Sequence, residues 1–246
     1  MTQIHPEKEY IITAANRDLC LSVKPDHPHV LKPERVTHVN SITDNLVYVV
    51  PASGMTLREF MGRRKNSRRS FFASNIMKLN PFDILQQLID ACDFMLANNM
   101  MPSQSCINPD LIWIDVGSNK LYARIIYTMC VNTRDDKIYW APELLRKYQH
   151  VEYYDVSKQA SLRRCDTRPS SISSVYSLGL VLYFMATGTD PFDCEHSRVD
   201  TYARPFVANL NPTIAGMVLL TTKEAKERPT INELREYITN TQSKCL

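Results

Sequence analysis

SSVYSLGLVLYFMATGTDPF, residues 173–192, contains the longest apolar run in the chain. On a helix drawn over residues 174–187, apolar side chains occupy every face instead of a single stripe. A bilayer-spanning helix needs about 20 predominantly apolar residues, and this run is shorter and more mixed in composition. We therefore expect a helix that is buried on all sides in a protein core, with the rest of the chain packed around it.

The whole chain has 246 residues, of which 44% are hydrophobic and 22% are charged. This length allows one domain with a sizeable core or two small lobes. The net charge of +3 gives no argument for binding nucleic acid or a membrane. The seven cysteines form no CxxC pair, which is typical of reduced thiols in an intracellular, cytoplasmic protein. No ligand pattern indicates a metal or another cofactor.

Strand-like runs precede helical ones along the chain. EYIITAANRDLCLSVK, residues 9–24, predicts two strands around a polar turn, and valine-rich runs follow at 29–39 and 45–50. After Pro51 the period changes to that of a helix. The sequence therefore predicts an α+β fold in which strands come first and helices second, joined near residues 51–56.

The helix expected after Pro81 carries its own start signals. Asn80 suits the N-cap, Pro81 the first turn and Asp83 the positive end of the helix dipole. Its buried face is expected to consist of Leu85, Leu88, Ile89, Cys92 and Met95. A Thr230 and Glu233 pair has the spacing of a capping box and predicts the start of a last helix.

Three stretches in order carry a resemblance to a known family. They are YWAPELL with Ala141-Pro142-Glu143, the run 173–192, and KERPTINEL with Arg228-Pro229. Together with INPDLIWID before them, they resemble the C-terminal lobe of a eukaryotic protein kinase. The resemblance implies a kinase-like fold with a rudimentary β-rich N-lobe over residues 1–52 and a helical C-lobe over 53–242. It also implies that Glu143 pairs with Arg228 as a bidentate ion pair.

The residues that a kinase uses for phosphoryl transfer are replaced. The first glycine of the chain is Gly54, so no glycine-rich loop precedes it. In the alignment that the resemblance implies, Cys106 stands in place of the catalytic base and Leu111 in place of the metal-binding asparagine. Arg124 falls at the first position of the Asp-Phe-Gly motif, where it places a positive charge at the Mg²⁺ site. Ser174 replaces the aspartate that holds the catalytic loop.

Lys24 is the one weak candidate for contact with a nucleotide. It resembles the phosphate-contacting lysine of kinases, but the sequence leaves no room for the helix that would carry its glutamate partner. Residues 8–24 are predicted as a hairpin, and a helix over the same residues is the alternative. Cys106 is interpreted as a structural cysteine, because no histidine in the loop would serve as its base.

We therefore expect a catalytically inactive pseudokinase that acts as a protein-interaction scaffold or allosteric adaptor and needs no cofactor. One alternative is a kinase non-catalytic C-lobe domain that binds a partner's peptide. Another is a residual nucleotide-binding protein or atypical kinase-fold enzyme. Two segments are candidate contact regions: the polar stretch 146–173, and a predicted loop at 62–70 whose basic residues are Arg63, Arg64, Lys65, Arg68 and Arg69.

Overall fold

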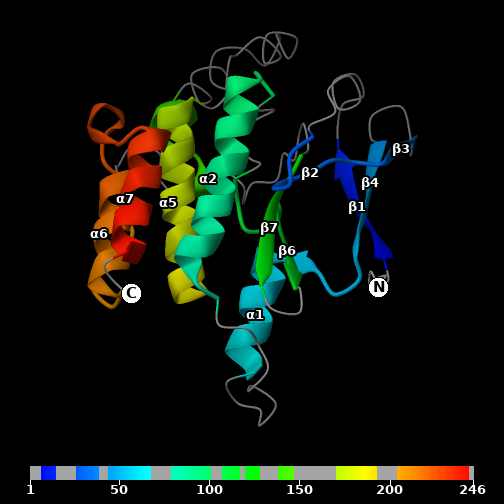
Figure 1. The fold of residues 1–246 in the computed structure, drawn as a ribbon, viewed down its shortest axis with the longest axis horizontal. Coiled ribbons are helices and arrows are strands. Elements are labelled where there is room, and N and C mark those ends of the chain that lie inside the picture. The colour runs from blue at the N-terminus through cyan, green and yellow to red at the C-terminus, as the bar shows by residue number, and fades with distance from the viewer. Residues whose placement is uncertain are drawn as a thin grey trace.

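The computed structural model describes residues 7–14, 26–38, 44–67, 79–100, 107–116, 120–127, 138–146, 170–192 and 204–243. The helices after residue 80 gather on one side of the molecule and two small sheets lie on the other, while the helix over residues 57–67 lies below the second sheet (Figure 1). The strands are β1 Glu7–Ala14, β2 Val30–Leu31, β3 Arg35–His38, β4 Asp44–Pro51, β5 Met55–Thr56, β6 Ile112–Val116 and β7 Leu121–Ile126. The helices are α1 Leu57–Ser67, α2 Pro81–Ala97, α5 Ser171–Thr187, α6 Pro212–Thr221 and α7 Ile231–Ser243, with a 3₁₀ turn η4 at Ala225–Glu227. The α+β class is confirmed.

The strands form two sheets that combine segments from distant parts of the chain. One sheet has the order β1-β4-β3 and the other β2-β7-β6-β5. The prediction that strands come first and helices second is therefore wrong for β6 and β7, which follow α2. Strand β6 pairs with β7 in an antiparallel hairpin, and two-residue β2 adds to the other edge of β7 in parallel.

Strand β1 decides between the hairpin and the helix for the first part of residues 8–24. Residues 7–14 are a strand, paired with β4 in a register that places Tyr10 opposite Tyr48. The alternative helix over 8–24 is therefore wrong for these residues, because the aromatic and β-branched residues Tyr10–Thr13 favour a strand. The second strand of the predicted hairpin lies outside the described residues.

The predicted central helix is α5, and its burial is confirmed. Every residue from Ser173 to Met185 is buried, and α5 packs against α2, α6 and α7. Ser170 caps its N-terminus, and Gly188 ends it in the left-handed conformation with φ of 71°. Gly179 allows α6 to approach, because a Cβ at this position would lie 1.9 Å from Thr221 Oγ1.

α2 is the helix that joins the helical side to the sheet, since it packs against both α5 and β7 (Figure 1). The Asn80 side chain accepts a hydrogen bond from the N–H of Phe82, and Pro81 begins the helix, as predicted. The five predicted core positions of α2 are all buried. Thr230 and Glu233 form the predicted capping box at the start of α7, with Glu233 accepting the Thr230 N–H at 2.7 Å.

Buried apolar side chains form two separate clusters. The larger surrounds α2 and α5. The smaller, which we call the inter-sheet cluster, consists of Leu31, Leu46, Tyr48, Val50, Leu111, Trp113 and Ile126. These residues come from β2, β4, β6, β7 and the residue before β6, so the cluster joins the two sheets.

Across the part of the chain that the structure describes, no helix is long and apolar enough to cross a membrane. Among the same residues, no group of three or more histidine, cysteine, aspartate or glutamate side chains is placed to hold a metal ion.

Candidate functional site: a loop held by an arginine clamp

The loop before β6 is fixed by its own asparagine. Asn108 Oδ1 accepts hydrogen bonds from the backbone N–H groups of Asp110 at 2.8 Å and Leu111 at 3.1 Å. The Asn108 backbone carbonyl also accepts from Leu111 N at 3.1 Å. An asparagine that bonds to the backbone two residues later closes a tight turn without help from other elements. Asn108 is 1% exposed, so its side-chain oxygen depends on hydrogen bonds from the protein and not from water.

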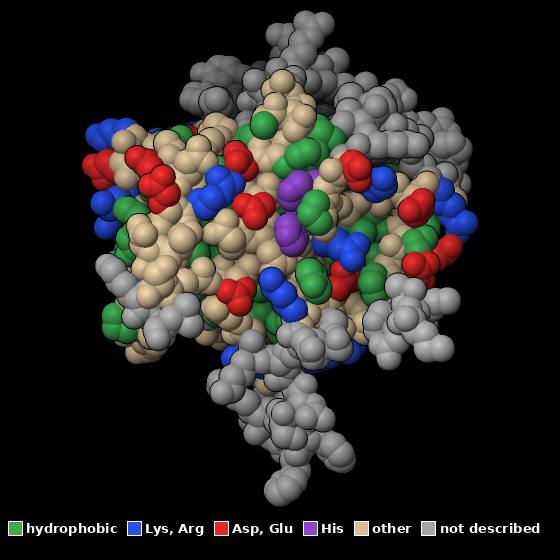
Figure 2. All heavy atoms as spheres, viewed as in Figure 1, with side chains coloured by type: hydrophobic (Ala, Val, Ile, Leu, Met, Phe, Trp, Pro, Cys, Tyr) green, Lys and Arg blue, Asp and Glu red, His purple; other side chains and the backbone are tan. Residues whose placement is uncertain are grey.

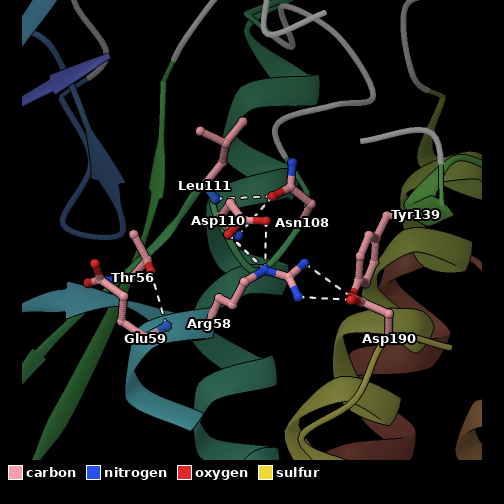
Figure 3. A network of polar contacts seen from close by, with 8 residues as sticks. All are labelled: Thr56, Arg58, Glu59, Asn108, Asp110, Leu111, Tyr139 and Asp190. Atoms are coloured by element: carbon pink, nitrogen blue, oxygen red, sulfur yellow. Dashed lines mark hydrogen bonds and ion pairs between the residues drawn. The ribbon is translucent and has the colours of Figure 1, made fainter. Parts of the chain in front are cut away.

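Arg58 of α1 holds this loop against the helical layer, and we call this arrangement the arginine clamp (Figure 3). Its Nε lies 2.8 Å from both carboxylate oxygens of Asp110, and its backbone N–H donates to Pro109 O at 3.2 Å. Its two terminal nitrogens donate to Asp190, just after α5, at 2.9 and 3.0 Å. One guanidinium therefore ties α1, the loop and the segment after α5 together.

Tyr139 completes the arginine clamp. Its hydroxyl donates to Asp190 Oδ1 at 2.7 Å. Burial, together with the charge of Asp190, raises the pKa of Tyr139 well above its usual range. For Arg58, burial alone would lower the pKa, but hydrogen bonds and charges from Asp190 and Asp110 outweigh it and raise the pKa. At neutral pH Tyr139 is thus a hydrogen-bond donor and Arg58 is charged, an arrangement suited to holding elements together.

The start of α1 is a further part of this site. The Thr56 N–H donates to Glu59 Oε2 at 3.1 Å, and the Glu59 N–H donates to Thr56 Oγ1 at 3.2 Å. This reciprocal pair is a capping box, and the letters T-L-R-E at 56–59 would have predicted it. The arginine clamp is different: it was not predicted, although Asp110 and Asp190 lie within stretches that the sequence singled out.

Leu111, at the position of the metal-binding asparagine in the predicted alignment, points into the inter-sheet cluster and is 4% exposed. The aromatic neighbours around it are closely packed. Tyr48 is fully buried and donates to Tyr127 O at 2.8 Å, and the ring centroids of Tyr10 and Trp113 lie 5.0 Å apart. The side chain at this position is therefore part of a hydrophobic core.

Arg124 lies in the middle of β7, opposite Trp113 of β6. Its guanidinium forms an ion pair with Asp115, whose other carboxylate oxygen accepts a hydrogen bond from Trp113 Nε1 at 2.7 Å. The positive charge predicted at this position is therefore present, but the carboxylate of Asp115 on the neighbouring strand β6 neutralises it. Strand β7 continues through Ile126, so Arg124 lies within the strand. Cys106 and Lys24 lie outside the described residues.

The predicted pair between Glu143 and Arg228 forms. Arg228 donates to the two carboxylate oxygens at 2.6 and 2.9 Å. Its Nε also donates to Lys223 O at 2.7 Å, and its guanidinium lies 4.8 Å from the centre of the Tyr176 ring. The pair connects the short helical stretch 142–146 to the turn before α7.

Ser174 lies in the first turn of α5 and is fully buried. Its Oγ has no hydrogen-bond partner among the described residues. The neighbouring Ser173 instead completes the helix cap with Ser170.

The basic segment is not the loop that the sequence predicted. Helix α1 continues through Ser67, so Arg63, Arg64 and Lys65 are helical. Arginine and lysine are good helix formers, and this propensity extends the helix. The Arg63 side chain is exposed and that of Arg64 partly exposed. The Lys65 side chain, Arg68, Arg69 and residues 147–169 of the second candidate segment lie outside the described part of the chain.

No family model matches this chain, and comparison with the curated proteins finds no match.

Proposed function

We propose that this protein is a pseudokinase: a protein-kinase-like fold that no longer transfers phosphate and acts as a protein-interaction scaffold or allosteric adaptor. The observation that carries the proposal is the burial of Leu111 in the inter-sheet cluster. The alignment places a metal ligand at this position, where an apolar side chain packs against Trp113 and Tyr48 instead. Mg²⁺ requires oxygen ligands, which an apolar cluster does not offer.

Structural parts of the kinase pattern support the same proposal. The Glu143–Arg228 pair is bidentate, and α5 is buried from Ser173 to Met185. The sheet β1-β4-β3 favours a reduced N-lobe over the alternative of a C-lobe domain alone. The chain keeps this framework but has other residues at the catalytic positions. A role in binding another protein explains this combination best.

The first experiment measures thermal unfolding with ATP, with and without Mg²⁺. We expect no change in the melting temperature. A ligand at a hundredfold excess over its Kd would add about 2.7 kcal/mol of stability, which corresponds to a rise of roughly 5–11 °C for a chain of this size. A rise of that size that Lys24→Met abolishes would support the rival proposal of a nucleotide-binding protein.

The partner is proposed to be an acidic or phosphorylated protein that contacts the outer end of α1. Arg63, Arg64, Lys65, Arg68 and Arg69 place five positive charges within nine residues, and such charges repel each other until an acidic surface neutralises them. No nucleic acid is expected as the partner, so nuclease-treated lysate is the starting material. Replacing all five with serine should remove the partner from a pull-down while circular dichroism shows an unchanged fold.

A matched variant separates a local effect from a general loss of charge. Lys120, just before β7, and Lys226, in η4, are exposed basic residues outside α1, and their replacement with serine should leave the partner bound. Binding through α1 should also weaken as salt rises, because exposed charges are screened over about 8 Å at physiological ionic strength. If the five-serine variant recovers the same partners with the same salt dependence, the contact lies elsewhere on the protein.

A further inference from the structure

The short strand β2 is reached through a turn that depends on a histidine ring. The His27 backbone carbonyl accepts from Val30 N at 3.1 Å, and Pro28 at the second position favours a turn of this kind. The His29 backbone N–H donates to His27 Nδ1 at 3.2 Å. A ring nitrogen accepts a hydrogen bond only through a free lone pair, so this contact requires Nδ1 of His27 to be unprotonated.

The same ring fastens the turn to α2. The His27 ring stacks on Phe94 with centroids 4.7 Å apart and an angle of 22° between the planes. Figure 2 shows the histidine side chains near the centre of one face, with acidic and basic side chains beside them. Strand β2 itself is held against β7, because Ile125 N donates to His29 O at 2.9 Å and Tyr127 N donates to Leu31 O at 2.8 Å.

His29 responds differently to protonation. Its Nδ1 lies 2.9 Å from the carbonyl oxygen of Ala123, and because a carbonyl only accepts, Nδ1 of His29 carries the hydrogen. Adding a proton to the other nitrogen of His29 leaves this hydrogen bond intact. A proton on Nδ1 of His27 instead turns the acceptor into a donor that faces the donating N–H of His29. The two rings lie 5.8 Å apart, so one ring's charge also opposes the other's.

The charged groups around His27 come from several elements. Asp90 of α2 favours the protonated ring, but Arg235 of α7 pairs with both Asp90 at 3.3 Å and Asp93 at 3.0 Å and offsets their charge. On the strand side, β7 presents the Ala123 carbonyl to His29. Burial, and then the charge of His29, lowers the pKa of His27 despite the opposing effect of Asp90.

We propose that His27 is a pH-sensitive latch that fastens β2 between α2 and β7, and that protonation of its ring releases residues 26–31 while the helical core stays folded. β2 is well placed for such a role, since Val30 packs in the larger cluster and Leu31 in the inter-sheet cluster. Releasing it loosens the connection between the two clusters.

The sign of the pH dependence follows from the neutral ring that the latched state requires. The released histidine has a pKa near 6.5 and the latched one a lower pKa. The contribution of the latch is therefore complete above about pH 6.5 and decreases as pH falls from there toward the lowered pKa. Over that window, one linked proton increases the opening equilibrium by up to about tenfold per pH unit.

The test is amide hydrogen exchange between pH 5 and 8, corrected for the intrinsic pH dependence of exchange. The probes are the N–H groups of Val30, Ile125 and Tyr127, which bond within or to the latched segment. We expect their protection to fall by up to tenfold per pH unit below about pH 6.5, while amides of α5 keep theirs. Titration of the His27 ring by NMR should give a pKa below that of an unfolded peptide.

Two variants make the result specific. His27→Asn keeps an acceptor at the position of Nδ1 but does not titrate, so protection of the three amides should become independent of pH. His29→Gln should retain the pH dependence. The proposal is overturned if His27→Asn shows the same loss of protection at low pH as the natural protein, or if the His27 ring titrates at or above the pKa of the unfolded peptide.

Discussion

Replacing Glu143 with alanine tests the part of the framework on which the kinase-like alignment depends. The substitution removes both acceptors that Arg228 holds at 2.6 and 2.9 Å. The Arg228 side chain is 0% exposed and that of Glu143 is 31% exposed. In the variant, Arg228 therefore remains buried without a carboxylate partner, and the space left by the glutamate is partly open to water. A buried charge without its partner is the cause of the expected destabilisation.

The magnitude follows from what Arg228 keeps. Breaking a fully buried ion pair costs about 3–5 kcal/mol. Here the arginine retains the Lys223 carbonyl at 2.7 Å and the face of the Tyr176 ring at 4.8 Å, and Glu143 is partly solvated. We therefore expect Glu143→Ala to lower the free energy of unfolding by about 2–3 kcal/mol, which corresponds to a melting temperature lower by roughly 4–12 °C.

Thermal and urea unfolding followed by circular dichroism measure this change, with an exposed pair as the control. Glu224 lies 3.3 Å from Lys226 and both side chains are largely exposed, so Glu224→Ala should change stability by no more than about 0.5 kcal/mol. The double variant of Glu143→Ala with Arg228→Leu should cost less than the sum of the two single changes, because no charge is stranded. If Glu143→Ala costs no more than Glu224→Ala, the buried pair does not hold the framework together.

Three further substitutions test other parts of the molecule by urea unfolding. Leu111→Asn should lower the free energy of unfolding by about 2–4 kcal/mol, because it buries an amide without partners, and it should not create Mg·ATP binding; unchanged stability would argue against the burial of this position. Gly179→Ala should cost about 1–3 kcal/mol although alanine favours helices, because its Cβ would lie 1.9 Å from Thr221 Oγ1. Thr221→Ala should rescue it only in part, since the Thr221 Cβ also lies too close, at 2.7 Å. Arg58→Lys should lower the free energy of unfolding by about 1–2 kcal/mol and increase hydrogen exchange at residues 107–111, because a lysine cannot bridge two carboxylates as the guanidinium does. If exchange at these residues equals that of the natural protein, the loop does not need the arginine clamp.

The elements that the sequence predicted best are those with local signals. Helix α2 has a capping asparagine, a proline in its first turn and apolar residues at helical spacing, all within one segment. The burial of α5 follows from its own composition. The Glu143–Arg228 pair was found only through the resemblance, since the two residues lie 85 positions apart.

The arginine clamp could not be found in this way. Arg58 lies 52 residues from Asp110 and 132 residues from Asp190, and nothing local distinguishes these residues from surface charges. The same limit explains the error at the basic segment, where clustered charge predicted a loop and helix propensity extended α1 through Ser67.

The burial of α5 has a consequence for how the protein is made. Two of the helices that cover it, α6 and α7, come later in the chain, so a ribosome releases α5 before these partners exist. During that interval its apolar surface is exposed to water and to other nascent chains, which favours aggregation. A truncated product that ends before Pro212 would keep this exposure permanently, and quality control should remove it. Both α6 and α7 must therefore be made before the apolar surface of α5 is covered.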